Sequence, residues 1–517
     1  MNEDLDQKLI TFIKTLPMKK LIPFFSIFIF FSVTAQVPQI EWQVCLGGTD
    51  YDQGNAVTQT ADGGYAVVGG AISTNGNATG NHGGVDYLVV KLSSSGQVQW
   101  QKCLGGSGED GGYGIDATPD GGVIVSGHAY SNDGDVSGNH GSSDTWIIKF
   151  DVSGNIQWSK CYGGTGGEEY PARVKTTSDG GYVFVTNSGS TDGDVNPPVA
   201  GQTDFWLVKL NSSGTIEWAN TFGGSTSERP FDVEEAEDGG FIMAGVEYPG
   251  MGDYWWVVKA DSNGNQQWAK TYGLPLPAQQ AEDIEVVPGI GYIVVGQIDS
   301  AMNDGWVLLI DSSGNEIWDR HLSGSWYDNA VSVNVNDDGT YAVLGQTSSQ
   351  NGDITCNTQS TDKFWWLTLD ATGTTILNQF CFGGSGGDTP FMMRPTNDNG
   401  YICVGMTSST DGDVSGNHGS EDFWVVKLGY NVGIEENEDP VASIFPNPSS
   451  TSFHLTAPTP NFTIQLFDVN GRRLIKEDFR NSREAEIDVS QMPCGIYPLQ
   501  VLTDNGKMVW QKLVVGR

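Results

Sequence analysis

The chain has 517 residues, of which 69 are glycine, and tryptophan recurs along it at regular intervals. This length and composition argue against a single ordinary core and favour an array of short strands joined by tight turns. The formal net charge of −37 argues against nucleic acid or anionic lipid as a partner, because their phosphates would be repelled, and it suits cations or neutral polymers.

The first segment, residues 1–35, is predicted to be an N-terminal extension followed by an export signal. A Met-Lys-Lys run at 18–20 precedes an apolar run over 21–33, and small residues stand before Gln36. The run is too short to span a bilayer comfortably, so we predict a cleaved signal peptide and no transmembrane segment in the mature protein. We therefore expect a secreted or cell-surface protein.

Residues 36–430 repeat with a period of about 50 to 60 residues, and each period contains four strand-like pieces. The periods align on Trp42, Trp100, Trp158, Trp218, Trp268 and Trp318, with Asn378 in the seventh place. Four short antiparallel strands per unit are typical of a propeller blade. The piece over 39–45 precedes the first full unit and supplies the fourth strand that the last unit lacks. We predict an all-β, seven-bladed β-propeller closed by an N-terminal strand.

The loops of this predicted propeller differ between its two faces. Turns between strands one and two, and between three and four, are short and share one face. The other connections are longer and share the opposite face, except that the loops over 247–252 and 297–303 are short. We expect an asymmetric groove on the long-loop face, since variable loops on a rigid scaffold often carry binding.

An acidic linker over 431–441 leads to a different pattern of short strands over 442–517, which predicts a small β-sandwich. Its motifs are an F-P-N-P opening, a D-x-x-G-R turn and a G-x-Y triplet, carried by Phe445, Pro446, Asn447, Pro448, Asp468, Gly471, Arg472, Gly495 and Tyr497. This combination resembles the type A C-terminal sorting domains of type IX secretion substrates. The resemblance implies passage across the outer membrane and recognition by the type IX translocon and its shuttle protein. Pro498 departs from the family pattern and leaves the pairing of its strand open.

The repeats themselves resemble those of bacterial extracellular propellers. Their D-x-x-G-x-x-x-W run, as in 151–158, is similar to the tryptophan-docking motifs of quinoprotein propellers, which are structural. Nothing else in the sequence indicates a quinone cofactor.

Acidic loops before the third strand of several units are candidates for calcium binding. Their carboxylates, spaced by two around glycine, are Asp133, Asp135, Asp192, Asp194, Asp411 and Asp413. Hard oxygen ligands in a tight turn suit Ca²⁺, although no bidentate Glu follows as in an EF-hand. Asx-turns explain the same residues without a metal ion.

Three of these long loops contain an Asn-His-Gly triplet on predicted neighbouring blades. The residues are Asn81, Asn139, Asn417, His82, His140 and His418. Three histidines suit a transition metal, and Asn with His also suits a hydroxyl-rich ligand such as a sugar. A loop copied with the repeat explains the triplets without a ligand.

Two further acidic positions recur in nearly every unit. One precedes the first turn by ten residues and is held by Asp52, Asp110, Glu169, Glu228, Asp328 and Asp388. The other opens the third strand and is held by Asp86, Asp144, Asp204, Asp253, Asp304, Asp362 and Asp422. A cation at the channel mouth is one explanation for the first set. Because single carboxylates repeated this regularly usually cap loops, we interpret both sets as scaffold.

The seven cysteines cannot all pair, and no disulfide is expected among the four that share a repeat position. Cys45, Cys103, Cys161 and Cys381 hold one place in different repeats, so they are expected to lie too far apart to pair. Cys356, Cys403 and Cys494 have no evident partner in the sequence.

The sequence favours a binding protein over an enzyme. It contains no Gly-x-Ser-x-Gly elbow and no His-Glu-x-x-His motif, and its four propeller arginines, Arg173, Arg229, Arg320 and Arg394, share no register within their units. We expect the long-loop face to contact a glycan or an envelope protein. The alternatives are a polysaccharide-active hydrolase or lyase, since a carboxylate pair needs only spatial proximity, and a passive structural spacer.

Overall fold

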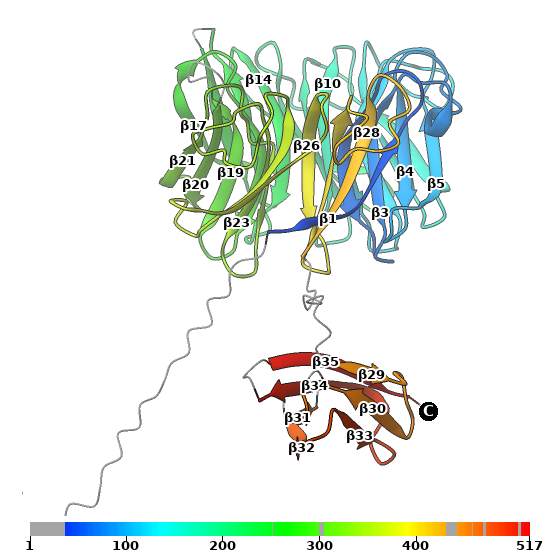
Figure 1. The fold of residues 1–517 in the computed structure, drawn as a ribbon. Helices are drawn as coiled ribbons and strands as arrows, with labels where there is room; N and C mark the ends of the chain where they lie inside the picture. Colours follow the sequence, from blue (N-terminus) through cyan, green and yellow to red (C-terminus); the bar gives the residue numbers. More distant parts are fainter. Residues whose placement is uncertain are drawn as a thin grey trace, which may run out of the picture. The chain divides into compact units, whose positions relative to one another are not determined.

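The computed structural model describes residues 37–250, 252–298, 304–430, 442–457, 459–468, 472–504 and 508–516. The predicted export signal, the linker and Gly471 lie outside these ranges. Within them the secondary structure is β, apart from one short 3-10 helix, η1 (Gly76–Ala78). The chain divides into two compact units, one up to Gly429 and one from Tyr430 onward (Figure 1).

The described part of the first unit forms seven four-stranded antiparallel sheets. Sheet 1 contains β2 (Asp52–Gln59), β3 (Tyr65–Ala71), β4 (Asp86–Leu92) and β5 (Val98–Leu104). Sheet 2 contains β6 (Asp110–Ala117), β7 (Val123–Ala129), β8 (Asp144–Phe150) and β9 (Ile156–Tyr162). Sheet 3 contains β10 (Glu168–Thr176), β11 (Tyr182–Ser188), β12 (Asp204–Leu210) and β13 (Ile216–Phe222). Sheet 4 contains β14 (Ser227–Glu235), β15 (Phe241–Tyr248), β16 (Asp253–Ala260) and β17 (Gln266–Leu276).

The remaining sheets of this unit follow the same order. Sheet 5 contains β18 (Gln280–Val287), β19 (Gly291–Ile298), β20 (Asp304–Asp311) and β21 (Glu316–Leu322). Sheet 6 contains β22 (Ser332–Val335), β23 (Tyr341–Thr347), β24 (Lys363–Leu369) and β25 (Ile376–Phe382). Sheet 7 contains β26 (Asp388–Pro395), β27 (Tyr401–Thr407), β28 (Asp422–Gly429) and β1 (Gln39–Leu46), which pairs antiparallel with β28.

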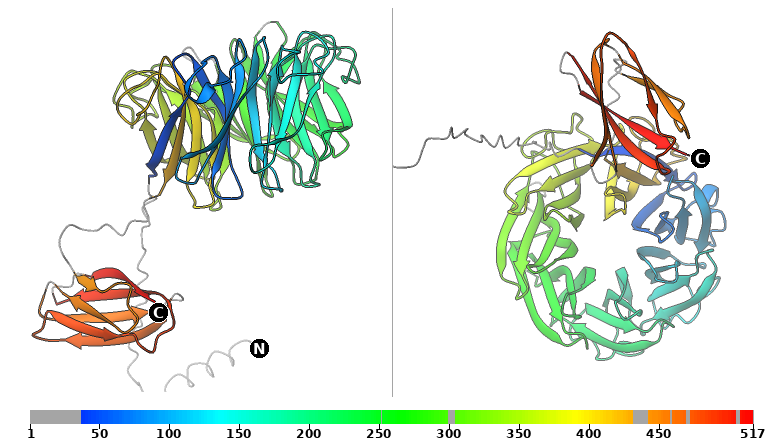
Figure 2. Two further views of the ribbon diagram at one scale, coloured as in Figure 1. Left: turned by 90° about the vertical axis from the view of Figure 1, so that its right-hand side faces the viewer. Right: turned by 90° about the horizontal axis from the view of Figure 1, so that it is seen from below.

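The seven sheets stand side by side in a ring (Figure 2). The first strand of each sheet contacts the first strand of the next, and β26 of sheet 7 contacts β2 of sheet 1. Second and third strands are buried on both sides, which explains their near-continuous apolar runs, whereas fourth strands are partly exposed. The unit therefore has a β-propeller-like fold.

Tryptophans dock six of the seven sheets onto the next sheet of the ring. The Trp42 ring, on β1, lies against Gly96 in the last turn of sheet 1, where an added Cβ would lie 2.7 Å from the ring. Trp100 of sheet 1 contacts Gly154 of sheet 2 in the same way. These turn glycines have positive φ, so they supply both the turn and a flat docking surface. The same contact recurs from Trp158, Trp218, Trp268 and Trp318 to Gly214, Gly264, Gly314 and Gly373.

The second unit contains two sheets. A three-stranded sheet has the order β29 (Ser443–Phe445), β30 (Ser452–Thr456), β33 (Glu484–Asp488). A four-stranded sheet has the order β32 (Arg473–Phe479), β31 (Phe462–Phe467), β34 (Gly495–Thr503), β35 (Met508–Val515). Their apolar faces share one core. Pro498 pairs with Lys512 of β35, and the pairing of β34 with β31 begins only at Leu499, so the proline lies beyond the doubly paired part of its strand.

The structure contains a disulfide for which the sequence showed no evident pairing. Cys356 and Cys381 form a disulfide with Cα atoms 5.3 Å apart. Cys381 is on β25 and Cys356 is in the loop before β24 of the same sheet, so the loop brings its cysteine onto the outer strand. The other cysteines of that repeat position, Cys45, Cys103 and Cys161, are free thiols.

Candidate functional site

A cavity of about 230 Å³ lies between sheets 1 and 2, at the end of the sheets where the long loops are. We call it the sheet 1–2 pocket. Its lining is rich in aromatic and amide side chains and consists of Tyr51, Gln53, Asn55, Gly70, Ile72, Val85, Glu109, Gly111, Tyr113, His128 and Tyr130. These residues lie at the starts of first strands, at the ends of second strands and in the connections beside them. A pocket with this lining is the default candidate for a ligand site.

One wall of the pocket is a chain of polar side chains along β2. The Tyr51 hydroxyl donates a hydrogen bond to Gln53 Oε1, and Gln53 Nε2 donates to Asn55 Oδ1 at 2.8 Å. Asn55 Nδ2 donates to the carbonyl of Gly112 in sheet 2 at 2.8 Å. The wall is thus anchored across the junction between the sheets and presents its amide groups in fixed orientations.

The opposite wall is aromatic. The His128 ring, on β7, lies with its centroid 5.4 Å from that of Tyr113 on β6 and 5.4 Å from that of Tyr130. Tyr130 is 44% exposed and Tyr51 is 36% exposed, so both rings are accessible at the mouth. Flat aromatic faces with a polar edge provide apolar contact and hydrogen bonding together.

The pocket carries one neutral imidazole and one carboxylate. Burial lowers the pKa of His128 to about 4, so its ring is uncharged at neutral pH. Glu109 lines the same pocket. The arrangement is suited to a neutral, hydroxyl-rich ligand that stacks on the tyrosines and exchanges hydrogen bonds with Gln53 and Asn55.

An open hollow of about 400 Å³ adjoins this pocket through Ile72 and contains two residues predicted from the sequence. Asn81 and His82 line it, with Thr74, Gly83 and Gly84. The Asn-His-Gly triplet of sheet 1 therefore lies beside the aromatic pocket, on the same end of the sheet.

The three predicted histidines do not meet at one point. Each belongs to a different sheet, and each ring Nδ1 contacts the aspartate four residues later, at 3.0 Å for His82 and at 2.6 Å for His140 and His418. The hydrogen bond with Asp86 raises the pKa of His82. No group of three or more His, Cys, Asp or Glu side chains is gathered for a metal ion within the residues that the structure covers.

The predicted asparagines hold the loops. Asn81, Asn139 and Asn417 donate from Nδ2 to backbone carbonyls at 2.8, 2.9 and 3.0 Å, and their Oδ1 atoms accept from the glycine two residues later. These bonds place the following histidine against its aspartate.

The acidic loop residues accept backbone hydrogen bonds. Asp133, Asp192 and Asp411 accept from Ser107, Thr165 and Ser385 at 2.7, 2.7 and 2.6 Å. The Oδ2 atoms of Asp135, Asp194 and Asp413 face the amides of Gly105, Gly163 and Gly383 at 3.4, 3.4 and 3.0 Å. The backbone bonds from Ser107 and its counterparts lower the pKa of the first three aspartates.

The repeated carboxylates lie at the junctions between sheets. Asp52 and Asp110 are fully buried and accept from the amides of Gly48 and Gly106 at 2.7 and 2.8 Å. At the third-strand position, burial raises the pKa of Asp86, Asp144 and Asp422.

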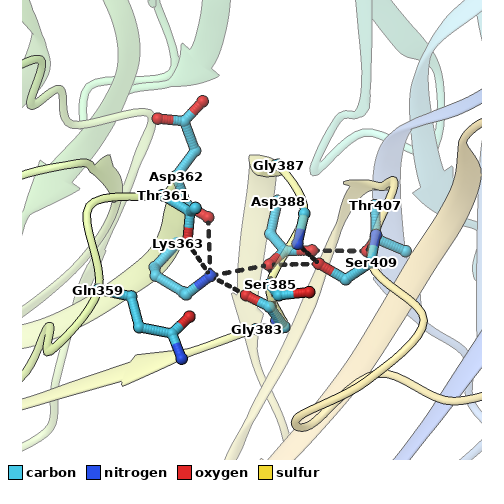
Figure 3. Close-up of polar contacts among 12 residues, drawn as sticks. Gln359, Thr361, Asp362, Lys363, Gly383, Ser385, Gly387, Asp388, Thr407 and Ser409 are labelled. Carbon is cyan, nitrogen blue, oxygen red and sulfur yellow. Dashed lines mark hydrogen bonds and ion pairs between the residues drawn. The ribbon is translucent and has the colours of Figure 1, made fainter.

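One sheet breaks this pattern, and here the prediction of seven equivalent aspartates is wrong. By register, Lys363 pairs with Thr347 of sheet 6, as Asp86 pairs with Ala71 of sheet 1, so Lys363 replaces the aspartate and Asp362 precedes the strand. Lys363 Nζ lies 3.5 Å from Asp388 Oδ2 and donates to the carbonyl of Gly384 (Figure 3).

Charged residues on the inner strands form a second group that the sequence did not reveal. Arg394 Nη1 lies 3.7 Å from Asp283 Oδ2 and 3.4 Å from Glu285 Oε1, and Lys175 contacts Glu234. Burial raises the pKa of Asp232, beside them, to about 8. Arg394 and Arg173 occupy different register positions in their strands, yet both interact electrostatically with Asp232 and Asp283. These charges pair with one another and bridge first strands.

The aromatic pocket was also not predicted, because its residues lie outside the repeated motifs. Tyr51 aligns with Glu109, and Tyr130 aligns with Ile72. A search for aromatic residues at positions that vary between repeats would have identified this pocket.

Comparisons with known proteins give one strong match. Residues 443–516 match the family model of the secretion system C-terminal sorting domain. An endo-acting ulvan lyase of Formosa agariphila is 26% identical over 157 residues, which cover 30% of this chain and 28% of that protein. The chain therefore spans less than a third of the length of that relative.

Among solved structures, the WD40 domain of Neurospora crassa Pan2 matches with a TM-score of 0.44 at 9% identity, covering 76% of this chain and 96% of that one. A Dyadobacter fermentans protein of unknown function matches with a TM-score of 0.41 at 12% identity, covering 76% and 99%. Structural similarity at these TM-scores is not evidence of function.

Hydrogen bonds of the second unit involve several of the motif residues that the sequence singled out. Asn447 Nδ2 donates to the carbonyl of Lys512 at 2.6 Å and its Oδ1 accepts from Val514 at 2.9 Å, which ties the F-P-N-P opening to the last strand. Asp468 accepts from the amide of Arg472 at 2.8 Å, and the Tyr497 hydroxyl donates to the carbonyl of Pro493 at 2.9 Å. The described part of the chain contains no helix of the length and apolarity needed to cross a membrane. The protein is a type IX secretion substrate with a C-terminal sorting domain, exported to the cell surface or beyond.

Proposed function

We propose that this protein is a glycan-binding module displayed or secreted by the type IX system, and that the sheet 1–2 pocket binds one sugar residue of a longer chain. The observation that carries this proposal is the pocket lining of two accessible tyrosines, one buried histidine and a fixed row of amides. Its volume of about 230 Å³ is slightly below the ~300 Å³ at which ligand pockets usually begin, which suits a single unit.

The proposal includes the architecture that presents this pocket. Residues 36–430 form a seven-bladed propeller whose ring β1 closes, residues 431–441 form a linker, and residues 442–517 form the sorting domain. Pairing of β1 with β28 and contact of β26 with β2 support the closed ring. A closed ring holds sheets 1 and 2 in fixed register, and a pre-formed pocket loses little entropy on binding.

The net charge of the protein limits the class of polysaccharide that we expect to bind. With a net charge of −37, strongly anionic polymers are repelled from most of the surface, so we expect neutral or weakly charged polysaccharides to bind best. The test is retention of the purified protein on a panel of immobilised polysaccharides, compared with Tyr51→Ala and Tyr130→Ala variants. We expect each substitution to weaken retention at least tenfold, because it removes a stacking face.

Trp510→Ala is the matched control, since this aromatic residue is 40% exposed but lies in the sorting domain. It should leave retention unchanged. Equal retention of all four proteins, or retention of none, would contradict a glycan site in this pocket and would favour a protein partner or a spacer role.

A lyase is the second candidate function, and the likeness to an ulvan lyase favours it. Elimination needs a base, and His128 is neutral at pH 7 and lies between Tyr113 and Tyr130. Incubating the protein with uronate-containing polysaccharides and measuring the ultraviolet absorbance of unsaturated ends tests this activity. Activity lost in a His128→Gln variant that still folds would establish the lyase, and absence of product from the wild-type protein would exclude it for those substrates.

A further inference from the structure

Two junctions of the ring bring pairs of buried aspartates to face one glycine. At the sheet 1–2 junction, a Cβ built on Gly105 would lie 2.4 Å from Asp86 Oδ1 and 3.0 Å from Asp110 Oδ2. At the sheet 7–1 junction, one built on Gly47 would lie 2.7 Å from Asp422 Oδ1 and 2.6 Å from Asp52 Oδ2. All four aspartates are 0% exposed.

In each pair, one carboxylate oxygen lacks a hydrogen-bond donor. Asp86 Oδ1 and Asp422 Oδ1 are buried and accept no hydrogen bond from any residue that the structure describes, although their Oδ2 atoms bind His82 and His418. A buried carboxylate oxygen without a partner, close to a second carboxylate, destabilises the fold unless a positive group lies between the two.

Sheet 6 supplies such a positive group from the chain itself. Lys363 stands at the register position of Asp86 and Asp422, and its Cδ atom is 3.0 Å from a Cβ built on Gly383. At the other two junctions the atom beside the corresponding glycine is Oδ1 of Asp86 or of Asp422. Two bonds further on, Nζ faces Asp388 Oδ2 at 3.5 Å and contacts the carbonyl of Gly384 (Figure 3). The sheet 6–7 junction thus carries a fixed ammonium group against the same first-strand carboxylate.

The sheet 3–4 junction differs in its first-strand residue, which is Glu228 where the sheet 1–2 and sheet 7–1 junctions have aspartate. Asp204 faces Glu228 across Gly223, and Asp204 Oδ1 and Glu228 Oε2 each lie 2.5 Å from a Cβ built on that glycine. At the sheet 1–2 and sheet 7–1 junctions the two facing residues are both aspartates.

We propose that the sheet 1–2 and sheet 7–1 junctions each bind a Ca²⁺ ion between the two facing aspartates, in the place that Lys363 Nζ occupies at the sheet 6–7 junction. Paired carboxylates are hard oxygen ligands, which Ca²⁺ prefers at 2.3–2.6 Å. The carbonyls of Gly106 and Gly48 correspond to that of Gly384 and are the candidate third ligands. Each site has only two acidic side chains and takes its other ligands from the backbone.

The two ions would flank the sheet 1–2 pocket, since Asp52 adjoins Tyr51 and Asp110 adjoins Glu109. Their role is to hold the starts of β2 and β6 in place. This proposal does not depend on glycan binding, because it predicts a metal content that no polysaccharide experiment measures.

The experiment measures bound calcium on the purified full chain after dialysis against chelator and back-titration with Ca²⁺, by calorimetry and by elemental analysis. We expect two tight equivalents, and a higher midpoint of thermal unfolding with Ca²⁺ than with chelator. Asp86→Lys and Asp422→Lys should each lose one equivalent and keep the fold, because lysine serves that position in sheet 6. Lys363→Asp should gain one equivalent.

A double variant, Asp133→Asn with Asp411→Asn, removes carboxylates from the exposed loops and should keep both equivalents. If a lysine variant fails to fold, the gain of one equivalent in Lys363→Asp still decides the question. The proposal is overturned if the wild-type protein holds no tight calcium, or if the stoichiometry is the same in Lys363→Asp and wild type. Unchanged or increased stability of Asp86→Asn, with no effect of chelator, would show that a shared proton occupies the junction instead.

Discussion

Histidines in this protein have two opposite environments. His82, His140 and His418 lie at the rim, with side chains 39, 43 and 46% exposed, and each contacts a buried aspartate. His128 is buried among aromatic rings in the sheet 1–2 pocket, where burial lowers its pKa to about 4. The rim histidines therefore help to anchor loops, whereas His128 is a neutral polar group inside a pocket.

His128 should make the folded protein sensitive to acid. Between pH 6.5, the usual pKa of histidine, and about pH 4, the unfolded chain binds a proton that the folded chain excludes. Stability therefore rises with pH in this window, and acidification through it costs up to about 3 kcal/mol. Urea unfolding near both limits should show a smaller loss for His128→Gln than for wild type.

The control for this measurement is His321→Gln, whose side chain is 47% exposed in sheet 5. Its loss of stability on acidification should equal that of wild type. An identical pH dependence for His128→Gln and wild type would show that His128 titrates normally and that the pocket is open to water.

The single residues that the sequence failed to identify share one physical cause. Tyr51 and Tyr130 line one pocket only because sheets 1 and 2 pack side by side, and Cys356 reaches Cys381 only because a loop folds over β25. Such contacts depend on three-dimensional packing between segments with no common pattern. The paired aspartates were visible in the sequence, but their facing arrangement across a glycine was not.

At the level of strands, repeated motifs were far more informative. The spacing of Trp42 and its counterparts set the repeat period, and four strand-like pieces recurred in each period. The structure has four strands in each of the seven sheets of the described first unit. The structure also explains Asn378. Sheet 7 has no turn between its third and fourth strands, because β28 ends at Gly429 and β1 comes from the other end of the chain. With no turn glycine to dock on, sheet 6 needs no tryptophan.

This explanation predicts a contrast between two substitutions at the same repeat position. Trp100→Ala removes a half-buried indole from the Gly154 turn and should lower the free energy of unfolding by about 2–4 kcal/mol. Asn378→Ala should cost less than about 1 kcal/mol. Denaturant unfolding of both variants gives the comparison. Equal losses would mean that the tryptophans stabilise their own sheet and do not join neighbouring sheets.

At the scale of the whole molecule, the proposed binding site and the sorting domain lie in different units. The first unit has its own cores and carries the pocket, and the second has its own core and matches the sorting domain over 443–516. The acidic charge belongs largely to the first unit, which suits a surface that faces the medium. Export and binding should therefore respond to different substitutions.

Ending the chain at Tyr430 should abolish export without unfolding the first unit. The truncated protein should collect in the periplasm of a type IX-competent host, because the translocon has no sorting domain to recognise. Its thermal midpoint, measured on purified protein, should match that of the same unit in the full chain, since no core residue of the first unit is removed. The matched control is the full chain carrying Tyr51→Ala and Tyr130→Ala, which keeps the sorting domain and should be exported normally. Export of the truncated protein, or retention of this control in the periplasm, would show that the propeller-like unit itself carries information for secretion.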